Sequence, residues 1–298
     1  DTDDDTVTAQ IRLSVDDANS DDTYDPLADQ TVSVENADDD TAGFTITPTL
    51  GLNTTEAGGT ASFTVVLDSE PVSDVSIGIS SSDTGEITVT PASLTFTSAD
   101  WNTAQTITLT GVDDDMDDGN TAVTILTDAA VSADPKYNGL NPADVSASNS
   151  DNDTAGITVN PTAGLTTTEG GGTASFTVVL NTQPAANVTI AVSSSDTTEG
   201  TVSVSSLVFT ATNWNDPQTV TITGEDEIVV DGSIAYTIQN ADAVSADPLY
   251  NGMSVSDVSV TNMDNDTPSI LAESDTVQVT EGAENTANVR LNTDPLGD

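Results

Sequence analysis

The side chains of this sequence that could do chemistry are carboxylates, and they recur at matching places along the chain. There are 50 Asp and Glu residues against three Lys and Arg, with no histidine and no cysteine, for a formal net charge of −47. The lack of histidine removes the usual general base and the commonest zinc ligand, and the lack of cysteine removes thiolate sites and disulfides. The remaining chemistry is that of carboxylates with hard cations.

Acidic residues mark four loops between residues 154 and 266. They are Glu169, Asp196, Asp226, Glu227, Asp231, Asp264 and Asp266. Each lies just after the first, third, fifth or seventh of seven expected strands, and alternate strands of an up-and-down antiparallel sandwich end at the same pole. Calcium takes six to eight oxygen ligands, mostly from flexible loops, whereas magnesium prefers small octahedral sites. The four loops therefore predict a calcium (Ca2+) site at one pole.

The elements that must position these loops are β-strands. Segments 61–67 and 105–111 alternate apolar and hydroxyl residues with a period of two, which is typical of half-buried strands and argues against a disordered chain. The strands expected in the second half lie near 156–160, 173–180, 186–193, 200–210, 217–224, 233–239 and 255–261. Short strands between turn residues predict an all-β, immunoglobulin-like antiparallel sandwich. A parallel β-helix is the alternative, but its repeats are far shorter.

The sequence is internally duplicated. Residues 41–153 align without a gap with residues 154–266, at an offset of 113, and 65 of the 113 pairs are identical. Residues 1–40 match the closing part of such a module, and residues 267–298 match the opening part. We therefore expect four parts of a longer tandem array: two complete modules between two partial ones. Trp101, Trp214, Tyr137 and Tyr250 are interpreted as core or corner residues.

The duplication extends the candidate calcium site to the other parts of the chain. The predicted metal ligands there are Glu56, Asp83, Asp113, Asp114, Asp118, Asp151 and Asp153 in the first complete module, and Asp38, Asp40 and Glu281 in the partial ones. The first module also carries surplus acid, which predicts an additional ion. Glu86 and Glu199 match as well, but exposed turn residues would explain that identity. The competing interpretation is a solvated acidic surface of a halophilic or marine protein, and the acids shared by both modules favour calcium.

The order and spacing of these acids resemble those of the Calx-beta family. The matching pieces are Glu169-Gly170, Asp226-Glu227, Asp231-Gly232 and the closing Asp264-Asn265-Asp266, with Glu56, Asp113-Asp114 and Asp118-Gly119 in the first module. Two departures are Ala57 in place of the glycine, and Thr121 and Ile234 where the family often has a second acid. Calx-beta modules occur in sodium–calcium exchangers, integrin-associated proteins and very large bacterial surface proteins. The resemblance implies a sandwich that binds calcium, is tightened by it and has no enzymatic activity.

Charge and motifs also narrow the function. The negative charge excludes ordinary binding to nucleic acid or anionic membranes, and no apolar run approaches the roughly 20 residues that span a bilayer. No catalytic constellation is evident, so an enzyme is not expected. We expect a calcium-stiffened rod, stalk or fibre of a secreted or cell-surface protein that serves adhesion or assembly. Its partners would be neighbouring modules and, in a fibre, other copies. The alternatives are a filament joined by strand addition and a calcium sensor of a membrane transporter.

Overall fold

The computed structural model describes residues 2–282 and 284–294. The expected partial modules at 1–40 and 267–298 also include residues 1, 283 and 295–298, which lie outside the described residues. Contacts divide the chain into two compact units, Asp1–Asp114 with Asp118–Asn152, and Asp115–Asp117 with Asp153–Asp298. The regular elements of the described residues are strands. These residues form no helix that is long and apolar enough to cross a membrane. The predicted module boundaries stay a prediction.

Alternation of apolar and hydroxyl residues forms the strands, as the central strand of each unit illustrates. Strands β5 (Thr60–Leu67) and β15 (Thr173–Leu180) share the sequence TASFTVVL and the same alternating burial. In β15, Phe176, Val178 and Leu180 are buried in the core, while Thr177 and Val179 between them are only half-buried. Thr and Val favour the pleated, half-buried surface that results.

The first unit contains a sandwich of two sheets. One sheet has the strand order β3-β5-β9-β7, and the other has the order β11-β6-β10-β12-β4 with β8 paired to β6. The bounds are β3 (Phe44–Thr47), β4 (Leu52–Thr55), β6 (Val75–Ser81), β7 (Ile87–Thr90), β8 (Ser93–Phe96), β9 (Gln105–Gly111), β10 (Thr121–Thr127), β11 (Val131–Ser132) and β12 (Val145–Ser150).

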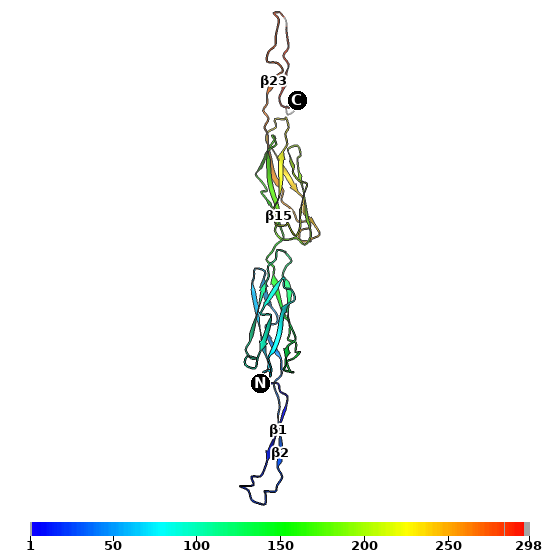
Figure 1. Ribbon diagram of the computed structural model, residues 1–298. Helices are drawn as coiled ribbons and strands as arrows, with labels where there is room; N and C mark the ends of the chain where they lie inside the picture. The colour runs from blue at the N-terminus through cyan, green and yellow to red at the C-terminus, as the bar shows by residue number, and fades with distance from the viewer. Residues whose placement is uncertain (1, 283, 295–298) are drawn as a thin grey trace. The chain divides into compact units, whose positions relative to one another are not determined.

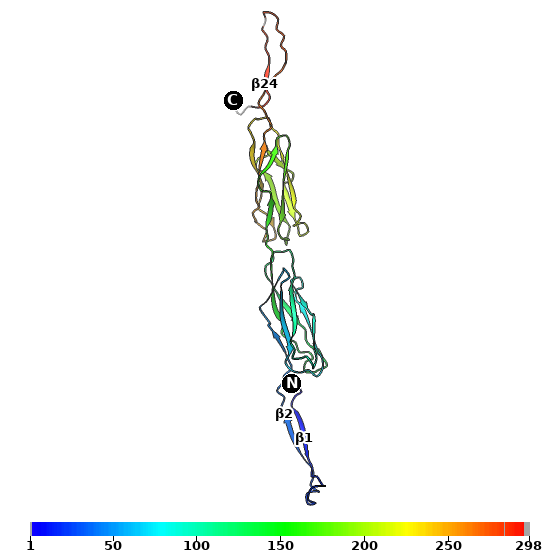
Figure 2. The same cartoon turned by 90° about the vertical axis from the view of Figure 1, so that its left-hand side faces the viewer.

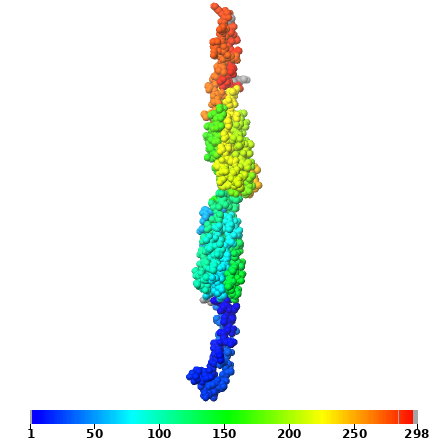
Figure 3. All heavy atoms as spheres, in the orientation of Figure 1, coloured from blue at the N-terminus to red at the C-terminus, as the bar shows by residue number. Residues whose placement is uncertain are grey.

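The second unit repeats this arrangement. Its sheets have the orders β13-β15-β19-β17 and β14-β22-β20-β16-β18, with β21 paired to β16. The bounds are β13 (Ile157–Asn160), β14 (Leu165–Thr168), β16 (Val188–Ser194), β17 (Gly200–Val202), β18 (Ser206–Phe209), β19 (Gln218–Gly224), β20 (Ile234–Asn240), β21 (Val244–Ser245) and β22 (Val258–Met263). In the space-filling view the atoms of this sandwich, coloured from green to yellow, pack into one continuous body (Figure 3).

An apolar core lies between the two sheets of each unit, and the all-β sandwich is confirmed. Phe63 and Ile107 from one sheet meet Ile77 and Ile125 from the other within one buried cluster. Tyr137 and Tyr250 are core residues as predicted. Each is 1% exposed, and their hydroxyls donate to the carbonyl oxygens of Ser69 and Thr182 at 2.7 and 2.8 Å.

The structure corrects three details of the predicted strands. The segment expected as one strand at 200–210 is two strands, β17 and β18, which belong to different sheets. A strand absent from the prediction, β14, follows β13 and crosses to the other sheet. There β14 pairs in parallel with β22, as β4 does with β12, so the sandwich is not purely antiparallel.

Two further strand pairs flank the sandwiches. Strands β1 (Val7–Leu13) and β2 (Gln30–Asn36) form an antiparallel hairpin in the first unit. They lie side by side in both ribbon views (Figures 1 and 2). Strands β23 (Ile270–Ala272) and β24 (Val289–Leu291) pair in the second unit. Large apolar side chains of these pairs, such as Ile11 and Ile270, are exposed.

Candidate metal centre

The parallel pair β14–β22 brings the first acidic loop of the second module next to the last. Thr168 pairs with Met263 at the end of this ladder, so the residues that follow them, Glu169 and Asp264, leave the sheet side by side. The Glu169 N–H donates to the Met263 carbonyl at 3.2 Å, and the Asn265 N–H donates to Glu169 Oε2 at 3.0 Å. Parallel strands run in the same direction, and this is why two loops 95 residues apart in sequence share one end.

The carboxylates at this end converge on Glu169, which is only 2% exposed. One oxygen each of Glu169, Asp264 and Asp266 lie within 4.8 Å of one another, and the same holds for Glu169, Glu227 and Asp231. Strand β19 ends at Gly224, and the loop that follows contributes Glu227 and Asp231. The loops after β14, β19 and β22 therefore meet as the sequence predicted.

Glycine allows β19 to end this close to β14. A Cβ at position 224 would lie 2.4 Å from the carbonyl oxygen of Thr168 and 2.5 Å from Asn262 Oδ1. Real Cβ atoms do not come this close to other heavy atoms. The equivalent Gly111 in the first unit is as crowded, at 2.2 Å from the Thr55 carbonyl oxygen. This contact holds the β19 loop against the residue that precedes Glu169.

Backbone N–H groups satisfy only part of this carboxylate cluster. The Gly232 N–H donates to Asp264 Oδ2 at 2.8 Å, and the Asp266 N–H donates to Asp264 Oδ1 at 2.7 Å. In contrast, Asp231 Oδ1 and Asp266 Oδ2 are buried without a hydrogen-bond donor. A buried, unpaired carboxylate oxygen is costly, and a cation would satisfy it. The residues present therefore fit a hard metal ion, because every donor in the cluster is an oxygen.

Burial and mutual repulsion raise the pKa of the carboxyls in the cluster. Burial is the largest cause of the raised pKa of Glu169, and the charges of Asp264, Asp266 and Asp231 add to it. The pKa of Glu227 is raised by burial and then by Asp231. Each group resists ionisation because it lies in a negative field with little water. A bound divalent cation would counter both effects by stabilising the ionised carboxylates.

The first module repeats the arrangement. The ladder β4–β12 ends with Thr55 opposite Ser150, so Glu56 and Asp151 leave the sheet together, and their carboxylate oxygens lie within 4.8 Å. Burial, followed by the charges of Asp151 and Asp114, raises the pKa of Glu56 to about 7. The Gly119 N–H donates to Asp151 Oδ2 at 2.7 Å, and Asn152 donates its side-chain N–H to Asp113 Oδ1 at 3.0 Å.

Glu86 and Glu199 are buried beside these carboxylates, and their interpretation as exposed turn residues is wrong. They are 8% and 6% exposed, and Glu86 Oε lies within 4.8 Å of carboxylate oxygens of Asp114 and Asp118. Buried Asn149 and Asn262 donate side-chain N–H groups to them at 3.2 and 3.4 Å. Burial raises the pKa of Glu199. Their identity in both modules was the signal that could have identified them.

Other predicted ligands lie outside these groups. Asp83 and Asp196 are exposed and accept hydrogen bonds from their own turns, from the Gly85 N–H at 3.0 Å and the Thr198 N–H at 3.0 Å. The Thr198 hydroxyl and N–H lower the pKa of Asp196. Asp226 and Glu281 are exposed. Asp38 accepts the Asp5 and Asp40 N–H groups at 2.9 and 3.1 Å.

No protein-family model matches the chain, and no curated protein matches it. Among solved structures it is similar to CBD12 from CALX1.2, with 13% identity, a TM-score of 0.35, and 73% of this chain and 98% of that chain covered. For the calcium binding domain CBD12 of CALX1.1 the values are 14%, 0.34, 74% and 99%. For domains 4 and 5 of the S-layer protein SbsC they are 18%, 0.28, 63% and 75%. These TM-scores are below 0.5 and do not establish a relationship, so membership of the Calx-beta family stays a prediction.

Proposed function

We propose that the acidic pole of each complete module binds calcium, and that the chain is a calcium-dependent structural segment of an extracellular surface protein. The observation that carries this proposal is the buried cluster around Glu169, in which Asp231 Oδ1 and Asp266 Oδ2 have no donor. Surface acidity alone would leave such oxygens in water. Here they are buried against protein atoms, where a bound cation would satisfy them.

Calcium fits the cluster better than the other common cations. Zinc favours nitrogen and sulfur ligands, and the chain has neither histidine nor cysteine. Magnesium demands near-ideal octahedral geometry and keeps several waters. Calcium accepts many carboxylate oxygens from flexible loops, as the loops after β14, β19 and β22 offer them. Bound calcium would also offset part of the net charge of −47.

Calorimetric titration with calcium tests the site. Glu169→Gln keeps the shape of the side chain and removes its charge, so it should weaken binding to the second module by about tenfold or more. Asp242→Asn removes the same charge from an exposed acid on the loop before β21 and should leave binding unchanged. Equal affinities for the two variants would contradict a site at Glu169.

The structural role follows from where the ligands lie. Asp264 and Asp266 follow β22, the last strand of the second sandwich, and the other ligands follow β14 and β19. A cation held between them would tie the exit of the module to its own loops and restrict the segment that continues the chain. The array would be stiffer with calcium than without it. Small-angle scattering with and without chelator measures this, and an unchanged maximum dimension would count against it.

The extracellular setting is supported by composition and by the calcium chemistry. The modules are free of cysteine, poor in Lys and Arg, and closely similar to one another. Outside cells, calcium at millimolar concentration would keep even weak sites filled. Adhesion or assembly at a surface is the role that such an array would serve.

A second candidate function is the joining of chains into a filament by strand addition. The observation in its favour is the exposure of apolar side chains on the strand pairs β1–β2 and β23–β24, including Ile11 at 52% and Ile270 at 70%. Added strands from another copy would cover them. Electron microscopy separates the two candidates, because isolated rods would contradict the filament and ordered polymers would support it.

A further inference from the structure

The complete modules contain a single basic residue, Lys136, and it lies against an acidic segment of the first unit. Its Nζ atom is 2.9 Å from Asp3 Oδ1 and 2.7 Å from Asp5 Oδ1. The other two basic residues, Arg12 and Arg290, belong to the flanking segments. The ammonium group of Lys136 therefore forms ion pairs with two carboxylates at once.

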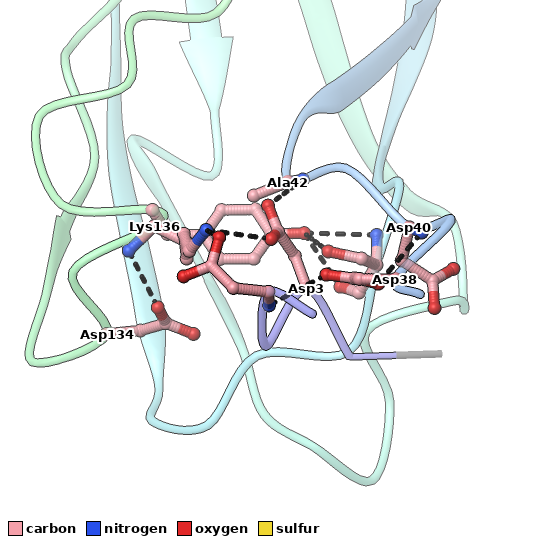
Figure 4. A network of polar contacts seen from close by, with 9 residues as sticks. Asp3, Asp38, Asp40, Ala42, Asp134 and Lys136 are labelled. Atoms are coloured by element: carbon pink, nitrogen blue, oxygen red, sulfur yellow. Dashed lines mark hydrogen bonds and ion pairs between the residues drawn. The ribbon is translucent and has the colours of Figure 1, made fainter. Parts of the chain in front are cut away.

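Figure 4 shows that these contacts continue into a network that fastens segment 2–6 to the start of the sandwich. Asp3 Oδ2 accepts the Ala42 N–H at 3.0 Å, just before β3. The Asp5 N–H donates to Asp38 Oδ2 at 2.9 Å, and Asp38 Oδ1 accepts the Asp40 N–H at 3.1 Å. Asp5 has a φ of 62°, in the left-handed region that aspartate tolerates better than most residues. Lys136 is the member of this network that carries positive charge.

The turn that contains Lys136 has the same hydrogen bonds as the equivalent turn of the second module, so the two turns differ in the side chain at this position. Asp134 is buried and accepts the Val72 and Lys136 N–H groups, each at 2.8 Å. Its counterpart Asp247 accepts the Ala185 and Leu249 N–H groups at 2.8 and 2.9 Å. Leu249 therefore stands in the second module where Lys136 stands in the first.

We infer that Lys136 is a tethered cation that docks the acidic segment 2–6 onto the first module without a metal ion. The partner that this surface fits is the acidic end of a preceding module. In this chain that end consists of the loop before β1, with Asp3 and Asp5, and the loop after β2, with Asp38. A module with leucine at the corresponding position lacks this device. The docking of such acidic loops would then depend on calcium at some modules and on lysine at others.

The chain offers two matched reporters. The Ala42 N–H donates to Asp3 Oδ2, and the Ala155 N–H donates to Asp117 Oδ2 at 2.8 Å within the second unit. Positions 42 and 155 correspond in the duplication. Hydrogen exchange of these two amides, measured by NMR on the whole chain, reads the lysine-held bond and its lysine-free counterpart in one experiment.

The test is exchange in the presence of chelator. Lys136→Leu, which copies Leu249, should speed exchange at Ala42 and Asp5 by about three- to tenfold, the range expected for losing two partly exposed ion pairs. Lys136→Arg should stay within about twofold of the original chain. Exchange at Ile107 in the core should not change, which shows that the sandwich is intact. About 1 M NaCl should speed the original chain toward the Lys136→Leu variant, because the screening length falls to roughly 3 Å.

Two results would overturn the inference: unchanged exchange at Ala42 in Lys136→Leu, or equally fast exchange in Lys136→Arg. The contrast with Ala155 rests on the proposed calcium binding, and its failure is distinguishable. If chelator speeds exchange at Ala155 but not at Ala42, both proposals are supported. If chelator changes neither, calcium binding is contradicted while the lysine variants still decide the role of Lys136. If chelator speeds both alike, Lys136 does not replace a metal.

Discussion

The loops after β9 and β19 share acids at three matching positions but hold them in two different settings. Residues 112–118 include five aspartates, whereas residues 225–231 include four acids and three apolar residues. Even so, Asp114 and Asp118 of the richer loop are exposed, and Glu227 and Asp231 of the poorer loop are half-buried. The Asp294 N–H donates to the Ile228 carbonyl at 2.7 Å and holds the second loop in place.

This difference shows that position, rather than number, makes a carboxylate part of the site. Glu169 is reached by both the β19 loop and the β22 exit, and the enclosed loop leaves Asp231 Oδ1 without a donor. In the first module the surplus Asp115 and Asp117 are not part of any group of carboxylates near Glu86 within the described residues. The comparison yields four predictions, in order of decreasing effect.

Removing calcium should have the largest effect. An ion at 100 times its dissociation constant adds about 2.7 kcal/mol to the free energy of unfolding, which is a shift of roughly 10 °C for a domain of this size. Trp101 packs against the first core and Trp214 against the second. The single variant Trp214→Phe therefore leaves Trp101 as the fluorescent reporter of the first module, and Trp101→Phe leaves Trp214 as the reporter of the second. Melting in calcium and in chelator then measures each module separately.

Salt sharpens the same measurement. Because exposed charges are screened more than enclosed ones, about 1 M NaCl should reduce the calcium-dependent shift of the first module more than that of the second. A melting temperature that chelator leaves unchanged in both modules would mean that their acids are plain surface charge.

The second prediction concerns pH in chelator. Glu56 has a pKa of about 7 in the folded chain against an ordinary value of 4.5, so the folded state holds this proton more tightly. The unfolding free energy of the first module should therefore fall by about 1–2 kcal/mol as pH rises from about 4.5 to about 7, less than the limit of 1.36 kcal/mol per pH unit because nearby solvent screens the repulsion. Saturating calcium should abolish the fall. A first module equally stable at both pH values in chelator would contradict the repulsion at Glu56.

The third prediction concerns Gly224, which lies against the Thr168 carbonyl oxygen. Gly224→Ala places a Cβ against backbone and should cost about 1–3 kcal/mol of unfolding free energy, and it should also weaken calcium binding by displacing the β19 loop. Gly170→Ala is the matched control, since its nearest neighbour would be Asn265 Nδ2 at 3.9 Å and the first module has Ala57 there. Equal melting temperatures for the two variants would show that the close approach at Gly224 is unimportant.

The smallest effect is expected from adding acid to the second loop. Ile228 is 64% exposed and corresponds to Asp115, so Ile228→Asp copies the first module without touching the cluster. Stability in calcium should change by less than about 0.5 kcal/mol, as for other surface substitutions, and calorimetry should show the same affinity. A tenfold gain in affinity would show that the number of acids matters after all.

Several features of this chain could be predicted from sequence because they depend on local pattern or on duplication. The period-two alternation in segments such as 173–180 predicted strands, and the 113-residue offset predicted matching acids in both modules. Strand parity predicted that the loops holding Glu169, Asp231 and Asp264 share a pole, where the structure places them. Parity needs only the direction of each strand, which the order of strands supplies.

The remaining features depend on contacts between distant segments. Strand β14 is only four residues long, too short for a periodic pattern, yet its parallel pairing with β22 is what places Glu169 beside Asp264. Glu199 and Asp196 are both acids of one short loop. In the folded chain Glu199 is buried and accepts a hydrogen bond from the distant Asn262, whereas Asp196 is exposed.

The sequence by itself therefore determined the all-β class, the duplication and the end of the module where carboxylates gather, because alternation, identity and strand order are properties of the chain. The tertiary structure decided which carboxylates lose their water. Burial depends on the ladders β4–β12 and β14–β22 and on the close approach at Gly111 and Gly224, and these join residues some 40 to 95 positions apart. That desolvation is what a cation bound at the proposed site would offset.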